Sequence, residues 1–217
     1  GGSGQIRFRP LRPGGVWKVL EKQPHSISII ATYFYNGNII INYYDNLLSF
    51  CEQNYAQFQI VFTVREKDDP VIEIVKKLIS KFSDLDLELV INDKIIGHNL
   101  KVSNLANGLE LAKYDLIVMA DSDIRVESNY LQEIVKPFIQ QEVGVVTCLY
   151  KSLASHWLSR FESLSITSEF QPRILTASKL EGMQYAFGST IAIRRQVLEE
   201  IGGFFAIADY LADDYQL

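Results

Sequence analysis

The chain has 217 residues, 47% of them hydrophobic, so it can bury one sizeable core. The formal net charge is −5, from 21 basic and 26 acidic residues, and no basic face is interleaved with aromatic residues, which argues against a nucleic-acid-binding surface. The two cysteines, Cys51 and Cys148, stand far apart in apolar stretches and predict buried free thiols rather than a disulfide or a zinc site.

The first 25 residues show no pattern of regular structure. Residues 1–4, Gly-Gly-Ser-Gly, are typical of an expression linker and are left out of the predicted fold. Residues 5–25 form a basic arm interrupted by prolines and glycines, either a frayed terminus or a juxtamembrane segment that contacts an anionic leaflet. No apolar run is long enough to span a bilayer and no signal peptide is present, so we expect a soluble fragment.

From residue 26 onward, strand and helix patterns alternate. Short β-branched runs predict strands, and apolar residues at helical spacing predict the helices between them. The predicted strands are residues 26–31, 59–64, 87–91 and the run into Asp121, and the predicted helices are residues 38–51, 70–82 and 100–112. Strands joined by such helices form parallel βαβ units, so residues 26–217 are expected to be one α/β domain with a Rossmann-like, mostly parallel sheet.

Beyond Asp123 the pattern is less regular. Helices are predicted for residues 127–138, 151–170 and 194–201, and strands for residues 143–149 and 185–193. Gly188 interrupts the last strand, and glycine inside a strand often marks a bulge or the close approach of a ligand. Gly202-Gly203 ends the last helix, as left-handed capping predicts.

The sequence Asp121-Ser122-Asp123 ends the stretch that begins at Tyr114 and directly follows its apolar run, residues 116–120. Such a run is typical of a strand buried on both faces, and ligands of open α/β sheets bind outside the carboxyl ends of these strands. Two carboxylates at that point offer hard oxygen ligands for Mg²⁺ or Mn²⁺, the ions that usually carry diphosphates. The alternative is a solvated turn, and Asp-x-Asp alone does not decide between the two.

Carboxylates also stand at two other informative places. Asp69 precedes Pro70, which is placed at the first helical position, so Asp69 is expected to cap that helix. Asp213 and Asp214 lie among aromatic residues, where adjacent carboxylates shift each other's pKa and suit a general base in a cleft. The alternative is that this pair caps a helix that begins at Tyr215.

Several motifs occur in a recognisable order. They are Asp68-Asp69-Pro70, residues 97–105 (Gly-His-Asn-Leu-Lys-Val-Ser-Asn-Leu), residues 113–117 (Lys-Tyr-Asp-Leu-Ile) leading to Asp121-Ser122-Asp123, then Gly202-Gly203 and Asp213-Asp214-Tyr215. From about Ser26 to the end, this order resembles the ceramide glucosyltransferase family, glycosyltransferase family 21, with its bacterial hopanoid-associated relatives. The resemblance implies a GT-A fold, a nucleotide-sugar donor, a divalent cation (Mg²⁺ or Mn²⁺) and an inverting hexose transfer to a lipid hydroxyl at the cytosolic face of a membrane.

The resemblance also assigns roles to single residues. It places Asp69 at the uridine end of a UDP-sugar, Lys101 at the family's donor-site lysine, and Asp121 with Asp123 at the metal and the diphosphate. Asp214 falls on the family's catalytic base, which takes the acceptor proton in an inverting displacement. From the residues alone, Lys101 would be an exposed helix lysine and Asp69 a helix cap.

Three features depart from the family pattern. Residues 31–38 stand in place of a Lys-Pro-Leu-Lys-Gly type loop that borders the uracil, and residues 170–173 (Phe-Gln-Pro-Arg) stand in place of a Ser-His-Pro-Arg stretch. The chain also stops at Leu217, before the family's Gln-x-x-Arg-Trp motif and membrane-associated C-terminal helices. We therefore expect a truncated catalytic domain that lacks lipid transfer on its own.

Two kinds of function remain open. The first is a metal-dependent transferase that moves a hexose from a UDP-sugar to ceramide or a similar lipid, with a hopanoid N-acetylglucosaminyl or hexosyl transferase as a variant of the same chemistry. The second is a nucleotide-sugar-binding GT-A domain without turnover. The expected partners are a UDP-sugar, a lipid acceptor and, through the missing C-terminal segment, the membrane.

Overall fold

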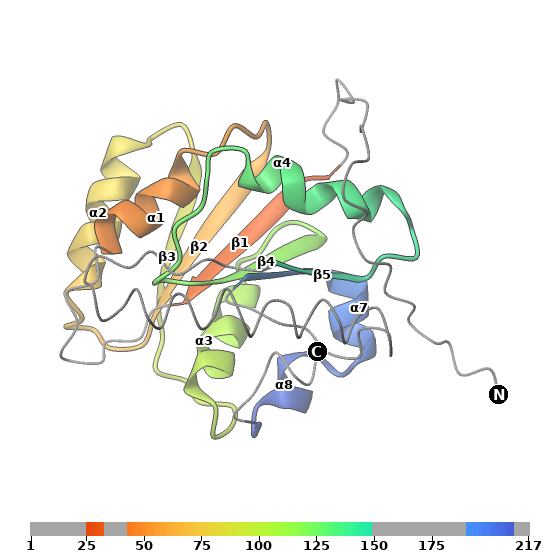
Figure 1. The fold of residues 1–217 in the computed structure, drawn as a ribbon. Coiled ribbons are helices and arrows are strands. Elements are labelled where there is room, and N and C mark those ends of the chain that lie inside the picture. The colour runs from red at the N-terminus through yellow and green to blue at the C-terminus, as the bar shows by residue number, and fades with distance from the viewer. Residues whose placement is uncertain (1–24, 33–42, 149–189, 211–217) are drawn as a thin grey trace, which may run out of the picture.

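The computed structural model describes residues 25–32, 43–148 and 190–210, and within them six strands form one sheet (Figure 1). The strand order is β3-β2-β1-β4-β6-β5. The strands are β1 (Ile27–Thr32), β2 (Phe58–Val64), β3 (Asp86–Ile91), β4 (Leu116–Asp121), β5 (Val145–Thr147) and β6 (Thr190–Arg194). Each predicted strand has its counterpart among these, with ends that differ by a few residues.

Helices fill most of the connections between the strands. They are α1 (Tyr43–Cys51), α2 (Val71–Lys81), α3 (Leu100–Leu109), α4 (Tyr130–Val135), the 3-10 helix η1 (Lys136–Ile139), α7 (Arg195–Glu200) and α8 (Gly203–Ile207). The prediction of one helix over residues 127–138 is wrong in extent, because the α-helix begins at Tyr130 and gives way to η1 at Lys136. Pro137 explains the change, since it has no N–H to donate to the carbonyl of Glu133.

The sheet is mixed, and the first four strands in the order, from β3 to β4, run parallel to one another. β1, β2, β3 and β4 pair in parallel, as the alternating pattern predicts, whereas β6 is antiparallel to both β4 and β5. The expected class, a mostly parallel, Rossmann-like α/β sheet flanked by helices, is confirmed. The chain passes from β1 to β3 on one side and then returns to place β4 on the other side of β1. Ligands of open sheets bind where the strand order reverses in this way.

Helices cover both faces of the sheet (Figure 1). Along β1, the side chains of Ile27 and Ile29 join the core formed with α1, α2 and α4, whereas Ile30 joins the core formed with α3, α7 and α8. All three isoleucines are fully buried. Burial of one such side chain contributes about 1.5–3 kcal/mol, so β1 ties the two layers of helices together.

α3 approaches the sheet closely at Gly108. A Cβ atom at this position would lie 2.6 Å from the Cγ2 atoms of both Ile30 and Thr63, so a side chain does not fit there. The close contact holds α3 against β1 and β2. Because α3 connects two parallel strands, it begins at the carboxyl edge of the sheet and runs back toward the amino edge.

Both cysteines are free, as predicted. Cys51 is buried at the end of α1, and burial raises the pKa of its thiol to about 12. Cys148 is partly buried, and burial also raises the pKa of its thiol. Neither thiol is ionised at neutral pH, which marks both as packing residues rather than nucleophiles.

Several predictions fall on residues that the structure does not describe. They concern the basic arm up to residue 24, the loop of residues 33–38, the helix of residues 151–170, the strand residues before Thr190, and Asp213 with Asp214. Among the described helices, none combines the length and the apolar character that a membrane span requires.

Candidate functional site

The register of the sheet brings polar side chains together at its carboxyl edge. Thr32, at the end of β1, pairs with Thr63 on one side and with Asp121 on the other. Both threonines are buried, whereas the Asp121 side chain keeps 30% of its surface exposed. The predicted strand-end position of Asp121 is therefore confirmed, and its carboxylate remains in contact with solvent.

Lys101, in the first turn of α3, forms an ion pair with Asp121. The Nζ atom of the lysine lies 3.0 Å from Oδ1 and 3.3 Å from Oδ2 of the carboxylate. Each side chain is less than a third exposed, so water screens the attraction only in part. Two residues that the resemblance assigned to the donor site are thus in contact.

Asp123 lies in the turn that follows β4. The backbone N–H of Ser122 donates to the carbonyl of Thr32 at 3.2 Å, and that of Ile124 donates to the carbonyl of Asp121 at 3.3 Å. Ser122 is buried, whereas Asp123 is exposed. The strand end therefore presents one carboxylate paired with a lysine and, two residues on, one that faces solvent.

These two carboxylates fit a divalent cation that is shared with a diphosphate. In the described ranges, no group of three or more His, Cys, Asp or Glu side chains is placed to hold a metal ion by itself. Mg²⁺ does not need such a group when a nucleotide is bound, because one or two carboxylates, phosphate oxygens and water complete its shell. Asp121 and Asp123 are the residues that could supply the protein ligands.

One face of α1 holds the backbone that follows the Asp-Ser-Asp turn. The side chains of Asn46 and Ser49, in α1, and of Gln53, two residues after its end, are buried and hydrogen-bond to the backbone of residues 122, 126 and 131, at 3.3, 3.1 and 3.0 Å respectively. Buried polar groups are stabilising when they are paired in this way. The three contacts fix the path of the chain beside Asp123, and no pattern in the sequence predicts them.

Asp69 is buried between β2 and α2. Its Oδ1 atom accepts a hydrogen bond from the N–H of Val71 at 2.9 Å, which confirms the predicted cap. Burial raises the pKa of Asp69, and the hydrogen bond from Val71 offsets the rise in part. Its assignment to the uridine end of a donor stays a prediction.

Asp214, the predicted base, lies outside the described residues. The nearest described stretch, residues 208–210, hydrogen-bonds to residues 98 and 99 just before α3. Asn99 and Asp209 make these contacts, and neither had a predicted role. An Asn directly before a helical pattern is a capping signal that could have identified Asn99, whereas nothing local marks Asp209.

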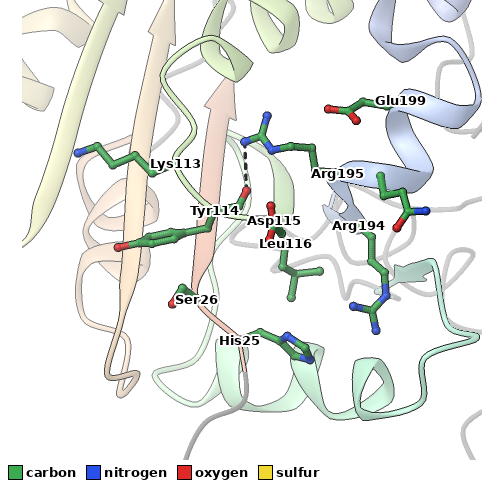
Figure 2. Close-up of a pocket in the computed structure, with 10 residues that line it drawn as sticks. His25, Ser26, Lys113, Tyr114, Asp115, Leu116, Arg194, Arg195 and Glu199 are labelled. Atoms are coloured by element: carbon green, nitrogen blue, oxygen red, sulfur yellow. Dashed lines mark hydrogen bonds between the residues drawn. The ribbon is translucent and has the colours of Figure 1, made fainter.

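A cavity of about 570 Å³ lies at the opposite, amino edge of the sheet (Figure 2). Its walls include Ser26 before β1, Lys113 and Leu116 at the start of β4, and Arg194 and Arg195 between β6 and α7. None of the predicted site residues lines it. Since ligands of open α/β sheets bind at the carboxyl edge, this cavity is on the unexpected side.

The cations of this cavity are engaged by the protein itself. Nη2 of Arg195 donates to the carbonyls of Ala112 at 2.6 Å and Tyr114 at 3.1 Å, the latter dashed in Figure 2. Arg194 donates to the carbonyls of residues 138 and 143, and Lys113 pairs with a carboxylate of β3. These contacts join chain segments to one another, so the charges of the amino edge stabilise the fold.

The strand order, the carboxylates after β4 and the lysine that begins α3 define a GT-A fold, the class of many nucleotide-sugar glycosyltransferases. The mannosyltransferase PcManGT from Pyrobaculum calidifontis, solved with GDP-Man and Mn²⁺, matches with a TM-score of 0.66 and 23% identity over 88% of this chain and 50% of its own. The S. aureus TarS fragment 1-349, solved with UDP, matches with a TM-score of 0.56 and 16% identity over 84% of this chain and 53% of its own. Identities this low show a shared fold.

The family is shown by the sequence itself. The model for Glycosyl transferase family 21 matches residues 41–217, and the chain belongs to that family. Ceramide glucosyltransferase 1 from Caenorhabditis elegans is 25% identical over 176 residues, which cover 80% of this chain. The same residues cover 38% of the relative, so the chain spans well under half of that protein's length.

Proposed function

We propose that this chain forms the donor-binding and catalytic part of an inverting glycosyltransferase that moves a hexose from a UDP-sugar to a lipid hydroxyl. The ion pair of Lys101 with Asp121 carries the proposal, because it joins a cation to a strand-end carboxylate at the edge where diphosphates bind. Membership of a family that matches ceramide glucosyltransferases supports a lipid acceptor.

The donor lies across the carboxyl edge of the sheet in this proposal. Asp69, at the start of α2, takes the uridine end, and Lys101 faces the diphosphate. A diphosphate attracts the ammonium group more strongly than a single carboxylate does, so Lys101 moves from Asp121 toward the phosphates when the nucleotide binds. Asp121 and Asp123 are the residues that would hold a divalent cation at the diphosphate.

The transfer needs a base on the acceptor and charge compensation on the leaving group. Asp214 accepts the proton of the lipid hydroxyl while that oxygen attacks the anomeric carbon from the face opposite the diphosphate. The configuration inverts, and no covalent bond to the protein forms. A bound Mg²⁺ or Mn²⁺ would supply charge neutralisation for the departing diphosphate, and Lys101 adds its own positive charge there.

The acceptor is reached at the cytosolic face of a membrane. Ceramide and similar lipids present a hydroxyl on an apolar body, so the enzyme meets them where the bilayer ends. The chain spans 38% of the Caenorhabditis elegans relative, and we assign further acceptor contacts to sequence outside these 217 residues. We therefore expect residues 1–217 to bind UDP and to transfer no measurable sugar to lipid.

The proposal is tested in two stages, the first of which measures binding. UDP is titrated into the 217-residue chain with Mn²⁺ and, separately, with EDTA, and the melting temperature is followed. A ligand that binds only the folded state raises the melting temperature by mass action, so the proposal predicts a rise in Mn²⁺ that EDTA removes. Binding that remains in EDTA is the weaker, metal-free part, and the rise that EDTA removes is the part that the metal adds. No rise in either buffer would contradict a donor site at this edge.

The second stage measures transfer. The full-length enzyme is given a panel of UDP-sugars and a native lipid extract, and glycolipid products are identified. One product with an inverted anomeric centre is the expected result. Nucleotide binding without any lipid product would instead support the competing function, a nucleotide-sugar-binding domain without turnover.

A further inference from the structure

Two segments far apart in the sequence are joined beside the donor site. The backbone N–H of Asn99 donates to the carbonyl of Ala208 at 2.8 Å, and its side-chain Nδ2 donates to the carbonyl of Tyr210 at 2.8 Å. The backbone N–H of His98 donates to Oδ1 of Asp209 at 3.0 Å, and Nδ1 of its ring lies 2.7 Å from the same oxygen. We call residues 97–99 and 208–210 the clasp.

Gly97 shows how closely the two halves of the clasp approach each other. A Cβ atom at this position would lie 2.5 Å from both the Cβ atom and the carbonyl oxygen of Ala208. Ala208 is buried, so it has no room to withdraw. The two backbones are therefore in direct contact, and a residue larger than glycine at position 97 would force them apart.

The ion pair of His98 with Asp209 is the weakest part of the clasp. The two side chains are 90% and 70% exposed, and exposed pairs contribute little to stability. The hydrogen bonds from the backbone and ring of His98 lower the pKa of Asp209, which shows that the contact favours the ionised carboxylate. The contacts of Asn99, which is partly buried, are better shielded from water.

Asn99 lies between two parts of the proposed active site. Its Oδ1 atom caps α3 by accepting from the N–H groups of Lys101 at 3.0 Å and Val102 at 3.2 Å. Its Nδ2 atom holds the carbonyl of Tyr210. One side chain thus fixes both the turn that carries Lys101, which pairs with Asp121, and the backbone at Tyr210.

Resting on the proposed function, we infer that Asn99 is a positioning residue, because it ties the turn that carries Lys101 to residues 208–210, which precede the proposed base Asp214 in the sequence. Tyr210 precedes Asp214 by four positions, and its carbonyl is the described contact nearest to the base along the chain. Displacement of a reacting group by about 1 Å can cost about a hundredfold in rate. The hydrogen bond from Asn99 to the carbonyl of Tyr210 therefore acts on turnover, whereas the cap of α3 acts on donor binding and stability.

The variant Asn99→Asp separates these two actions in the full-length enzyme. Aspartate caps a helix as well as asparagine does, so α3 and Lys101 keep their places. A carboxylate cannot donate to the carbonyl of Tyr210 and repels it, so the clasp opens at that point. We expect kcat to fall roughly tenfold or more, with KM for the UDP-sugar and the melting temperature close to those of the wild type.

His98→Ala is the matched control, because it removes the exposed ring and keeps the backbone N–H that holds Asp209. Its kcat should stay within about twofold of the wild type. An unchanged kcat in Asn99→Asp would overturn the inference and leave the proposed function standing. Two other results would overturn it as well: a fold-loss of UDP affinity as large as the fold-loss in kcat, or a melting temperature well below that of the wild type. In either case Asn99 would be a cap alone. A wild-type enzyme that transfers no sugar would refute the proposed function and the inference with it.

Discussion

The carboxyl and amino edges of the sheet are both rich in charged side chains, yet the charges have different partners. At the amino edge, Arg194 and Arg195 donate to backbone carbonyls of neighbouring segments, and Figure 2 shows the bond from Arg195 to Tyr114. At the carboxyl edge, Lys101 pairs with Asp121, one side chain with another, and Asp123 faces solvent. The cavity of about 570 Å³ lies at the amino edge, and the residues suited to nucleotide chemistry lie at the carboxyl edge.

The difference shows that the group to which a charged side chain is bound indicates its role better than its charge or its distance from a cavity does. A backbone carbonyl cannot leave its place without unfolding part of the chain, so an arginine bound to it fastens the structure. A pair of side chains can open and re-form around a ligand. We therefore expect substitutions at the amino edge to change stability and substitutions at the carboxyl edge to change function.

The largest effect is expected at the predicted base. Asp214→Asn in the full-length enzyme should lower turnover by roughly two to four orders of magnitude, because a lipid hydroxyl is a poor nucleophile without a proton acceptor. UDP affinity and melting temperature should stay near wild type, since the base faces the acceptor. A variant that instead melts much earlier would make Asp214 a helix cap and Asp213 the next candidate.

The second prediction compares two lysines, one at each edge. Lys101→Met should weaken UDP binding in Mn²⁺ roughly ten- to hundredfold, because a hydrogen bond to a charged group contributes about 1.5–3 kcal/mol. Lys113→Met is the matched control, since Lys113 also pairs with a carboxylate, that of Asp86 at 2.8 Å, but at the amino edge. Calorimetric titration should find its UDP affinity unchanged. Equal weakening in both variants would contradict the assignment of function to the carboxyl edge.

The third prediction concerns stability at the amino edge. Arg194→Met removes the hydrogen bonds to Val143 at 2.9 Å and Phe138 at 2.7 Å. A buried carbonyl left without a partner costs about 1–3 kcal/mol, so the free energy of unfolding should fall by about 2 kcal/mol and the melting temperature by roughly 4–8 °C. UDP affinity, measured well below the melting temperature, should not change. A stable variant with weakened UDP binding would reverse the comparison.

The smallest effect is expected from the buried carboxylate of Asp69. Because burial raises the pKa of Asp69, the folded state still holds the proton at pH values where the unfolded state has lost it. The stability that this group contributes therefore falls as the pH rises from the ordinary carboxyl range through the raised pKa. Asn keeps the cap and cannot ionise. The variant Asp69→Asn should therefore gain stability relative to wild type as pH rises, by less than about 1 kcal/mol. Urea unfolding at low and neutral pH measures this difference, and a gain that shrinks with rising pH would contradict it.

Much of the carboxyl edge could be predicted from local sequence. The apolar run of residues 116–120 ends at Asp121, and burial on both faces follows directly from such a run. Asp69 precedes a helix-starting proline, and its cap is seen. The extent of α4 was not predicted, because helical periodicity alone hides the effect of Pro137.

The contacts that hold the site together could not be predicted in this way. The clasp joins residues separated by 111 positions, and no local pattern shows which distant segment His98 or Asn99 will meet. The polar side chains of α1 and of Gln53 just after it gave no signal either, because their partners are backbone atoms more than 70 positions away. The antiparallel direction of β6 is likewise a property of the assembled sheet.

The most direct test of the account is the metal dependence of UDP binding at the Asp-Ser-Asp turn. Asp123→Asn in the 217-residue chain is compared with wild type by calorimetric titration of UDP, in Mn²⁺ and in EDTA. The account predicts that the variant binds UDP at least roughly tenfold more weakly than wild type in Mn²⁺ and equally well in EDTA, because a metal held by hard oxygen ligands loses one of them. Equal weakening in both buffers would mean that Asp123 supports the turn and holds no metal.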